Sequence, residues 1–279
     1  MKSYTTMTIH VHFATENNTV DYTKFAIKAM QQLADTSEEV ITTIHVLEQS
    51  LNRVDFSEFN RVKVIVVPER ADRQRGSFGH AMAINHMLKM TGDGSIHIIM
   101  DSDSVTLAKG WDTYINERFN YSNLGCIGTR YEDIGGFSSG TSKFQTYKSA
   151  PNFIWMALSP RHYWGDLDAE PQKHIPIDIT TEEMSKIYGL PIGYQVLCDG
   201  AWRLPEYLHK HKFTYEGFRQ IKPSSQESVV LHGLSDYHEE YHVNGKPFVI
   251  HQRGSSKHVY RQGVSKDFYA GADRYLKSL

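Results

Sequence analysis

The first hundred residues alternate between short apolar runs and segments with a helical repeat. The runs MTIHVHF, VITTIHVL and VKVIVV, at residues 7–13, 40–47 and 62–67, have the length and β-branched content of strands. Between the first two runs, apolar side chains recur on one helical face: Phe25, Ala26, Ala29, Met30 and Leu33. Strands that alternate with helices predict an α/β fold with a parallel sheet.

A fourth apolar run, IHIIM at residues 96–100, ends at two carboxylates, Asp101 and Asp103. It follows FGHAMAINHMLKM, a predicted helix that Ser77 would cap. Because the run has no polar alternation, we expect a strand that is buried on both faces. Residues i and i+2 of a strand project to the same side, so both carboxylates would face one ligand at the carboxyl edge of the sheet. One aspartate would suffice as a helix N-cap, whereas two favour a metal site.

The second half of the chain has a less regular pattern. CIGT, FIWMALS, SVVLH and PFVIH predict strands, and DGAWRLPEYLHKHK predicts a helix. TTEEMSKIYG predicts another helix, with a capping box formed by Thr180 and Glu183 and an end at Gly189. No internal repeat, low-complexity tract or linker interrupts the sequence, so we expect a single domain over residues 1–279.

Composition and charge exclude several classes of protein. Hydrophobic residues make up 40% of the 279 residues, enough to bury a core without disulfides. The two cysteines, Cys126 and Cys198, are too few for a disulfide framework or a cysteine-based zinc site. The net charge of -2 gives no indication of a surface that binds nucleic acid. No run approaches the roughly 18 apolar residues of a transmembrane helix, and MKSYTTMTIHVHF lacks a signal-peptide core, so we expect a soluble, cytoplasmic protein.

Four motifs, in order along the chain, resemble those of GT-A fold glycosyltransferases, in particular the large inverting family numbered 2. Asp101-Ser102-Asp103 matches their D-x-D motif, and GSFGHAMAIN matches an upstream G-x3-A-x3-N segment with one spacing off. CDGAWRL matches an acidic residue that opens a helix, and PFVIHQRGSS matches a late histidine. The resemblance rests on this order over residues 5–260. It implies a GT-A fold, Rossmann-like, with a mostly parallel sheet flanked by helices.

The resemblance also implies how the chain is divided and what it does. A nucleotide-binding half would span about 5–105, an acceptor half about 106–250, and a C-terminal lid or tail about 251–279. The implied activity is transfer of a sugar from a nucleotide donor, which we expect to be a UDP-sugar, to an unknown acceptor hydroxyl. The leaving diphosphate carries charge that Mn²⁺ or Mg²⁺ would neutralise.

The implied metal ligands are Asp101, Asp103 and His251. Asp103 would hold the metal, while Asp101 would contact the ribose or a metal-bound water. His251 would be the third protein ligand, and its imidazole would favour Mn²⁺ over Mg²⁺. The alternative for His251 is a histidine at a strand end that bonds to the backbone.

The donor-binding residues implied by the resemblance follow the ends of the predicted strands and the loop before the second helix. The arginines of ERADRQRGS precede a helix N-terminus, a natural place for an anion, although they also suit a solvated basic loop. The full set is Thr15, Glu16, Glu48, Arg73, Arg75, His80, Asp101 and Lys257.

An inverting transfer needs a base, and Asp199 in CDGAWRL matches the family's base position. A helix N-terminus there would keep Asp199 ionised, although an N-cap aspartate is an equal reading. Glu206 and Asp168 are the fallback bases. Among the aromatic residues before GDLD, we expect Trp164 to lie nearest the acceptor.

Three other classes of protein fit parts of the sequence. IHIIMDSDSV resembles the first motif of haloacid dehalogenase phosphohydrolases, with Asp101 as nucleophile and Asp103 as general acid/base, but that motif normally ends the first strand. HEEYHVNG, at residues 238–245, fits the H-E-x-x-H motif of zinc hydrolases, but its flanks lack an apolar helical face, so we interpret it as a polar turn. A non-catalytic module that binds a sugar nucleotide would keep the pocket without a working base.

Overall fold

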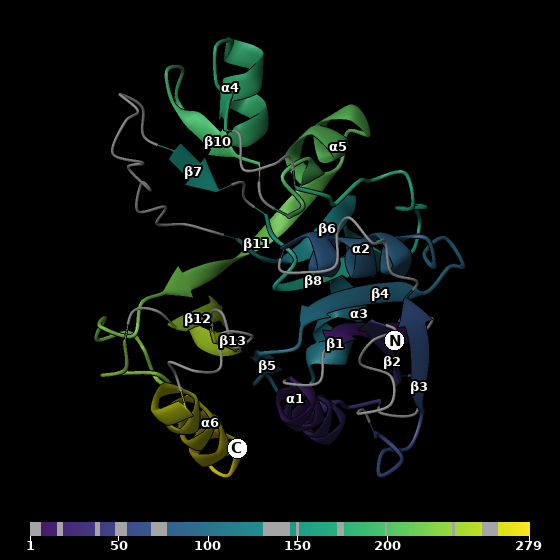
Figure 1. The fold of residues 1–279 in the computed structure, drawn as a ribbon, viewed down its shortest axis with the longest axis vertical. Coiled ribbons are helices and arrows are strands. Elements are labelled where there is room, and N and C mark those ends of the chain that lie inside the picture. The colour runs from purple at the N-terminus through teal and green to yellow at the C-terminus, as the bar shows by residue number, and fades with distance from the viewer. Residues whose placement is uncertain are drawn as a thin grey trace.

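The computed structural model describes residues 7–15, 19–36, 40–47, 55–67, 77–130, 146–148, 151–171, 176–198, 200–235, 238–252 and 262–279. These residues form a ten-stranded mixed sheet in the order β3-β2-β1-β4-β8-β6-β11-β12-β13-β5, and a small sheet in the order β7-β10-β9. Figure 1 shows the small sheet and α4 at one end of the molecule, with α1 and α6 at the other.

The first four strands of the large sheet form a parallel block. They are β3 (Val62–Val67), β2 (Val40–Leu47), β1 (Ile9–Thr15) and β4 (Ile96–Asp101), and each runs parallel to its neighbour. Residues 96–100 of β4 are all buried, which confirms the predicted strand covered on both faces. The carboxyl ends of these strands therefore share one edge of the sheet.

Two helices cover the parallel block on opposite faces. α1 (Val20–Leu33) packs Ala26, Ile27 and Met30 into the same core as Ile98, while α2 (Ser77–Leu88) packs into the core that contains Ile99. Consecutive residues of a strand point to opposite faces, so α1 and α2 lie on opposite sides of β4. Both helices were predicted from the sequence, α1 from the helical spacing of its apolar residues.

Beyond β4 the sheet is mixed, so the prediction of a mostly parallel sheet is wrong there. β8 (Trp155–Leu158) is antiparallel to β4 and to β6 (Leu124–Thr129), and β6 runs parallel to β11 (Thr214–Ile221). β12 (His238–Val243), β13 (Lys246–Gln252) and β5 (Ser104–Thr106) then continue as antiparallel neighbours.

A tight hairpin explains part of this antiparallel segment. β12 and β13 are joined by Asn244 and Gly245, whose φ angles are 51° and 75°. Two successive positive φ angles are those of a two-residue hairpin turn, and Asn-Gly is the pair that adopts them most readily. HEEYH therefore forms a buried strand of this hairpin, and its interpretation as a polar turn is wrong.

The remaining elements are α3 (Trp111–Tyr121), α4 (Glu182–Tyr188), α5 (Leu204–Lys210), α6 (Gln262–Leu276), β7 (Thr146–Lys148), β9 (Ile177–Asp178) and β10 (Gln195–Leu197). α6 occupies much of the stretch that was expected to be a lid or tail. Its Tyr269 stacks on Tyr22 of α1 and meets Phe25 edge-on, so α6 lies against α1 (Figure 1).

Two local predictions are corrected by hydrogen bonds from backbone amides to side chains. The cap of α4 is Thr181, whose hydroxyl accepts from the Met184 amide, and not Thr180; the helix does end at Gly189. SVVLH is not a strand. The amides of Val229, Val230 and Leu231 donate to the carboxylate of Glu240, which supplies the acceptors that a neighbouring strand would otherwise provide.

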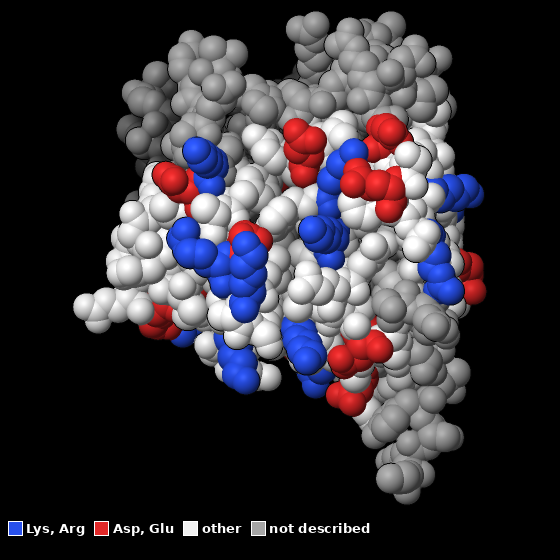
Figure 2. Space-filling model, turned by 90° about the horizontal axis from the view of Figure 1, so that it is seen from below, with Lys and Arg blue, Asp and Glu red and all other residues white. Residues whose placement is uncertain are grey.

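The surface around α1 and α6 carries charges of both signs. Figure 2 views the molecule from that side, and Lys and Arg lie among Asp and Glu on the described part of this face. In the described part of the chain, no helix combines the length and hydropathy that a bilayer span requires.

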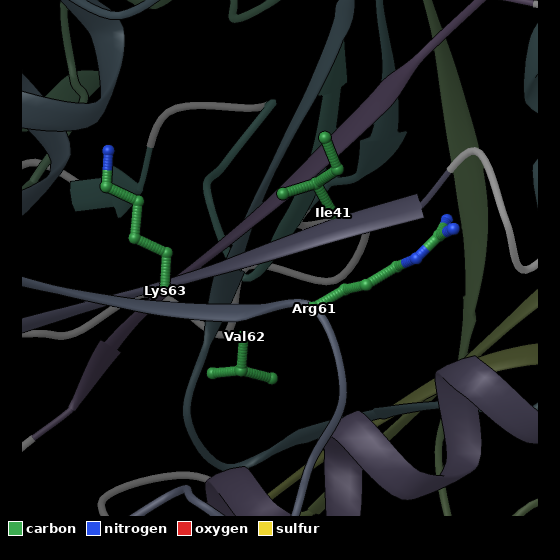
Figure 3. Close-up of a pocket in the computed structure, with 4 residues that line it drawn as sticks. All are labelled: Ile41, Arg61, Val62 and Lys63. Carbon is green, nitrogen blue, oxygen red and sulfur yellow. The ribbon is translucent and has the colours of Figure 1, made fainter.

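A pocket of about 340 Å³ lies beside the edge strand β3 (Figure 3). Ile41, Arg61, Val62 and Lys63 line it, and Val62 and Lys63 point to opposite faces of β3. Ile41, Val62 and Lys63 belong to the amino ends of β2 and β3, and Arg61 directly precedes β3. This pocket therefore lies at the edge of the block opposite to Asp101.

Candidate metal centre

Strand pairing brings Asp101, Asp103 and His251 together from distant parts of the sequence. Asp101 is the last residue of β4, and Asp103 follows in the turn that leads into β5. β5 pairs with β13 so that Ser104 stands opposite His251, and the Gln252 amide donates to the Asp103 carbonyl at 3.1 Å. The hairpin of β12 and β13 thereby brings His251 to the edge of the parallel block at which Asp101 lies.

The three side chains converge on one point. His251 Nε2 lies 3.3 Å from Asp103 Oδ1 and 3.7 Å from Asp101 Oδ2, and one ligand atom from each residue lies within 4.8 Å of the others. Among the described residues, no other group of three or more His, Cys, Asp or Glu side chains meets this condition. Two carboxylates with one imidazole form a donor set that suits Mn²⁺.

Burial and charge act in opposite directions on His251. Burial alone lowers the pKa of the imidazole, but the carboxylates of Asp103 and Glu239 raise that pKa to about 10. Without a cation, His251 is therefore protonated and donates toward both carboxylates. A bound cation would take the place of the Nε2 proton, because a metal ligand must be deprotonated at the coordinating atom.

Glu239 holds the other nitrogen of this imidazole. Its Oε2 lies 2.7 Å from His251 Nδ1, and its Oε1 accepts from Gln220 Nε2 at 3.1 Å. Sequence reasoning missed Glu239 because HEEYH was taken as a turn. The Asn-Gly pair that follows it was the available signal for a hairpin strand.

Two further groups border the carboxylates. His80 of α2 places its Nε2 2.7 Å from Asp101 Oδ1, so it contacts a candidate ligand. The Tyr269 hydroxyl is buried and has no hydrogen-bond partner among the described residues. Burial and the charge of Asp103 raise the pKa of Tyr269 well above its usual value. A buried, unpaired hydroxyl near Asp103, beside this donor set, fits a site that takes a polar ligand.

The donor residues predicted from sequence are described only in part. Thr15 ends β1 one residue after Ala14, which pairs with Asp101, but the Thr15 hydroxyl is buried and hydrogen-bonded to Thr23 at 2.9 Å. His80 and Asp101 contact each other, as described above. The remaining members of that set, together with the predicted base, lie outside the described residues: Glu16, Glu48, Arg73, Arg75, Lys257 and Asp199.

The fallback bases already have hydrogen-bond partners. Asp168 accepts from Arg203 Nη1 at 2.6 Å and from Asn85 Nδ2 at 3.1 Å, and Glu206 accepts from the Tyr188 hydroxyl at 2.7 Å. Both oxygens of the Asp168 carboxylate are therefore engaged by neighbouring side chains.

The structure also bears on Trp164 and on the zinc-hydrolase alternative. Trp164, expected near the acceptor, is fully buried and stacks with Tyr207 and Phe213. The zinc-hydrolase reading required a helix, whereas His238 and His242 lie four residues apart on the strand β12. That spacing separates their backbones by roughly 13 Å, too far for one zinc ion.

Comparisons with known proteins return structures only; no family model and no curated protein matches the chain. The structures include a mannosyltransferase from Pyrobaculum calidifontis in complex with GDP-Man and Mn²⁺, with 13% identity over 74% of this chain and 62% of that one, at a TM-score of 0.41. Mouse xyloside xylosyltransferase 1 in its apo form gives 11% identity, 76% and 84% coverage and a TM-score of 0.42. S. aureus TarS gives 15% identity, 76% and 60% coverage and a TM-score of 0.37.

The first two of these structures are of sugar transferases, the class that the sequence motifs resemble. The chain spans less than two thirds of the length of the mannosyltransferase. Every one of these TM-scores is below 0.5, so we infer function from the site residues alone.

Proposed function

We propose that this protein is a metal-dependent glycosyltransferase that moves a sugar from a nucleoside diphosphate donor to an acceptor hydroxyl. The observation that supports the proposal is the convergence of Asp101, Asp103 and His251 at the carboxyl edge of the parallel block. Open α/β sheets bind their ligands at this edge. A D-x-D pair and a late histidine are also the residues that the sequence resemblance assigns to the metal.

The three candidate ligands would have different roles in holding a cation and a diphosphate. Asp103 and His251 are buried and face each other, which suits fixed ligands. Asp101 is more exposed; His80 contacts its Oδ1, while its Oδ2 faces His251. When bound, Mn²⁺ or Mg²⁺ would neutralise the charge that builds up on the departing diphosphate. The imidazole among the ligands favours Mn²⁺.

The remaining assignments complete the proposal. The donor would be a UDP-sugar bound by Thr15, Glu16, Glu48, Arg73, Arg75, His80 and Lys257 along the strand ends and their loops. Asp199 would remove the proton of the acceptor hydroxyl and invert the anomeric centre. Thr15 would then contribute through its backbone, since its hydroxyl is bonded to Thr23. We prefer Asp199 to Asp168 as the base, because Asp168 already pairs with Arg203.

Calorimetric titration of UDP, with and without Mn²⁺, tests the proposal. We expect binding that requires the metal, followed by turnover when UDP-sugars are screened, and an inverted anomer in the product by NMR. If UDP fails, GDP and dTDP are titrated next. A protein that binds none of the three but releases phosphate from phosphate esters would instead use Asp101 as a nucleophile, and the glycosyltransferase proposal would be abandoned.

A further inference from the structure

We infer that Glu239 is a positioning residue of the metal centre: its carboxylate fixes the His251 imidazole so that Nε2, and not Nδ1, faces Asp101 and Asp103. The inference rests on the proposed metal site and assigns a residue that the sequence motifs do not contain. Glu239 acts on the site through its contact with His251.

The sheet itself sets the position of Glu239. β12 and β13 pair so that Glu239 stands opposite His251, and β13 and β5 pair so that His251 stands opposite Ser104. Side chains of directly opposed residues lie on the same face of the sheet within contact distance. The three adjacent strands therefore bring Glu239, His251 and the turn that carries Asp103 into one row.

The carboxylate of Glu239 is held at both oxygens. Oε2 lies 2.7 Å from His251 Nδ1, and Oε1 accepts from Gln220 Nε2 at 3.1 Å. Glu239 is only 2% exposed, so these partners replace water. A buried carboxylate without partners is costly, and this pair of contacts leaves it one orientation, with one oxygen aimed at the imidazole.

An ionised carboxylate can only accept hydrogen bonds, so it selects the state of the ring. His251 must carry its proton on Nδ1 to bond with Glu239, which leaves Nε2 with a lone pair once its own proton is displaced. Nε2 is the nitrogen that lies 3.3 Å from Asp103 Oδ1. A carboxylate on the far nitrogen also makes a histidine a more basic metal ligand.

The neighbouring residue, Glu240, provides a matched control. It is fully buried, as Glu239 nearly is, and it also contacts a histidine: its Oε1 lies 2.6 Å from His242 Nε2. Adjacent strand residues point to opposite faces, and Glu240 accepts from Ser228 and from the amides of residues 229–231. Its contacts are those of a carboxylate that holds a loop.

Direct titration of Mn²⁺ alone into the purified protein, by calorimetry or by the loss of the free Mn²⁺ signal in electron paramagnetic resonance, tests the inference. We expect Glu239→Gln to weaken Mn²⁺ binding about 10–100-fold, because a glutamine can turn either its oxygen or its amide toward Nδ1. Circular dichroism should show that the variant is folded. Glu240→Gln removes a carboxylate that is equally buried, and it should leave the Mn²⁺ affinity unchanged.

A second variant covers the case in which Glu239→Gln does not fold. Glu239→Asp keeps the charge but withdraws it from Nδ1 by one methylene, and we expect an affinity between those of the parent and the glutamine variant. Parent-like Mn²⁺ affinity in both variants, or in the aspartate variant where the glutamine variant is unfolded, would overturn the role of Glu239 and leave the metal site standing. Absence of Mn²⁺ binding in the parent protein would overturn the metal site and the role of Glu239 together.

Discussion

His12 Nε2 lies 2.9 Å from His97 Nδ1, and both imidazoles are buried between the sheet and α2. The contact is one link in a longer row. His12 Nδ1 lies 2.9 Å from His45 Nε2, and His45 Nδ1 lies 3.2 Å from His86 Nδ1 on α2. At the other end, His97 Nε2 meets Asp93 Oδ1 at 3.0 Å. We call His97, His12, His45 and His86 the histidine chain.

Asp93 sets the proton positions along the histidine chain. Burial raises the pKa of the Asp93 carboxyl group, but the hydrogen bond with His97 acts in the other direction, and the pKa of Asp93 lies below its usual value. Asp93 is therefore ionised and can only accept hydrogen bonds. His97 must then donate from Nε2, which makes its Nδ1 an acceptor for His12. By the same rule, His12 donates from Nε2 to His97, and His45 donates from Nε2 to His12. His86 then donates from Nδ1 to His45. Four neutral imidazoles are thereby satisfied with one arrangement of protons.

The histidine chain predicts that the protein is destabilised by mild acid. Burial lowers the pKa of His12 and His97, and lowers that of His45 to about 3. In the unfolded chain these groups bind protons below a pKa of about 6.5, so the unfolded state takes up more protons as the pH falls. The stabilisation is complete above pH 6.5 and is lost progressively below it. For His45 alone the loss at pH 5 is about 2 kcal/mol.

Urea unfolding at pH 7.5 and at pH 5 measures this loss. His45→Gln should be less stable than the parent at pH 7.5 but should lose less of its stability between the two pH values. His232 is exposed and outside the histidine chain, so His232→Gln should follow the parent at both. Equal parent stability at the two pH values would contradict the prediction.

A second prediction concerns the close approach of β6 and β8. A Cβ atom added at Gly128 would collide with the carbonyl oxygen of Trp155 and lie 2.9 Å from the Cα of Met156, and backbone atoms of a paired strand cannot move aside. We therefore expect Gly128→Ala to cost about 3 kcal/mol of folding free energy, at the upper end for overpacking. Thermal unfolding measures it, with Gly200→Ala as the control, because a Cβ there meets no atom closer than 4.0 Å. Equal midpoints for the two variants would refute the steric argument.

The sequence predicted the parallel block because β1 to β4 are apolar runs of strand length, and burial of such runs is a local property. The family resemblance implied Asp101, Asp103 and His251 as one ligand set, and the structure brings these three side chains together. β12 was missed because its polar side chains look solvated when read alone. Their burial depends on distant partners, such as His251 for Glu239. The strand predicted at SVVLH does not form for a related reason, because its backbone amides donate to the Glu240 carboxylate.

The last prediction isolates the charge of Asp103 from its shape. Asp103→Asn keeps an oxygen that can accept from His251 Nε2 but removes a negative charge from the cation site. We expect the variant to fold, to show a thermal midpoint within a few degrees of the parent, and to bind UDP no better with Mn²⁺ than without it. The control is Asp273→Asn, which makes the same chemical change at an exposed position on α6 paired with Lys277. That variant should keep the full effect of Mn²⁺. If Asp103→Asn retained it as well, Asp103 would have no part in holding the metal.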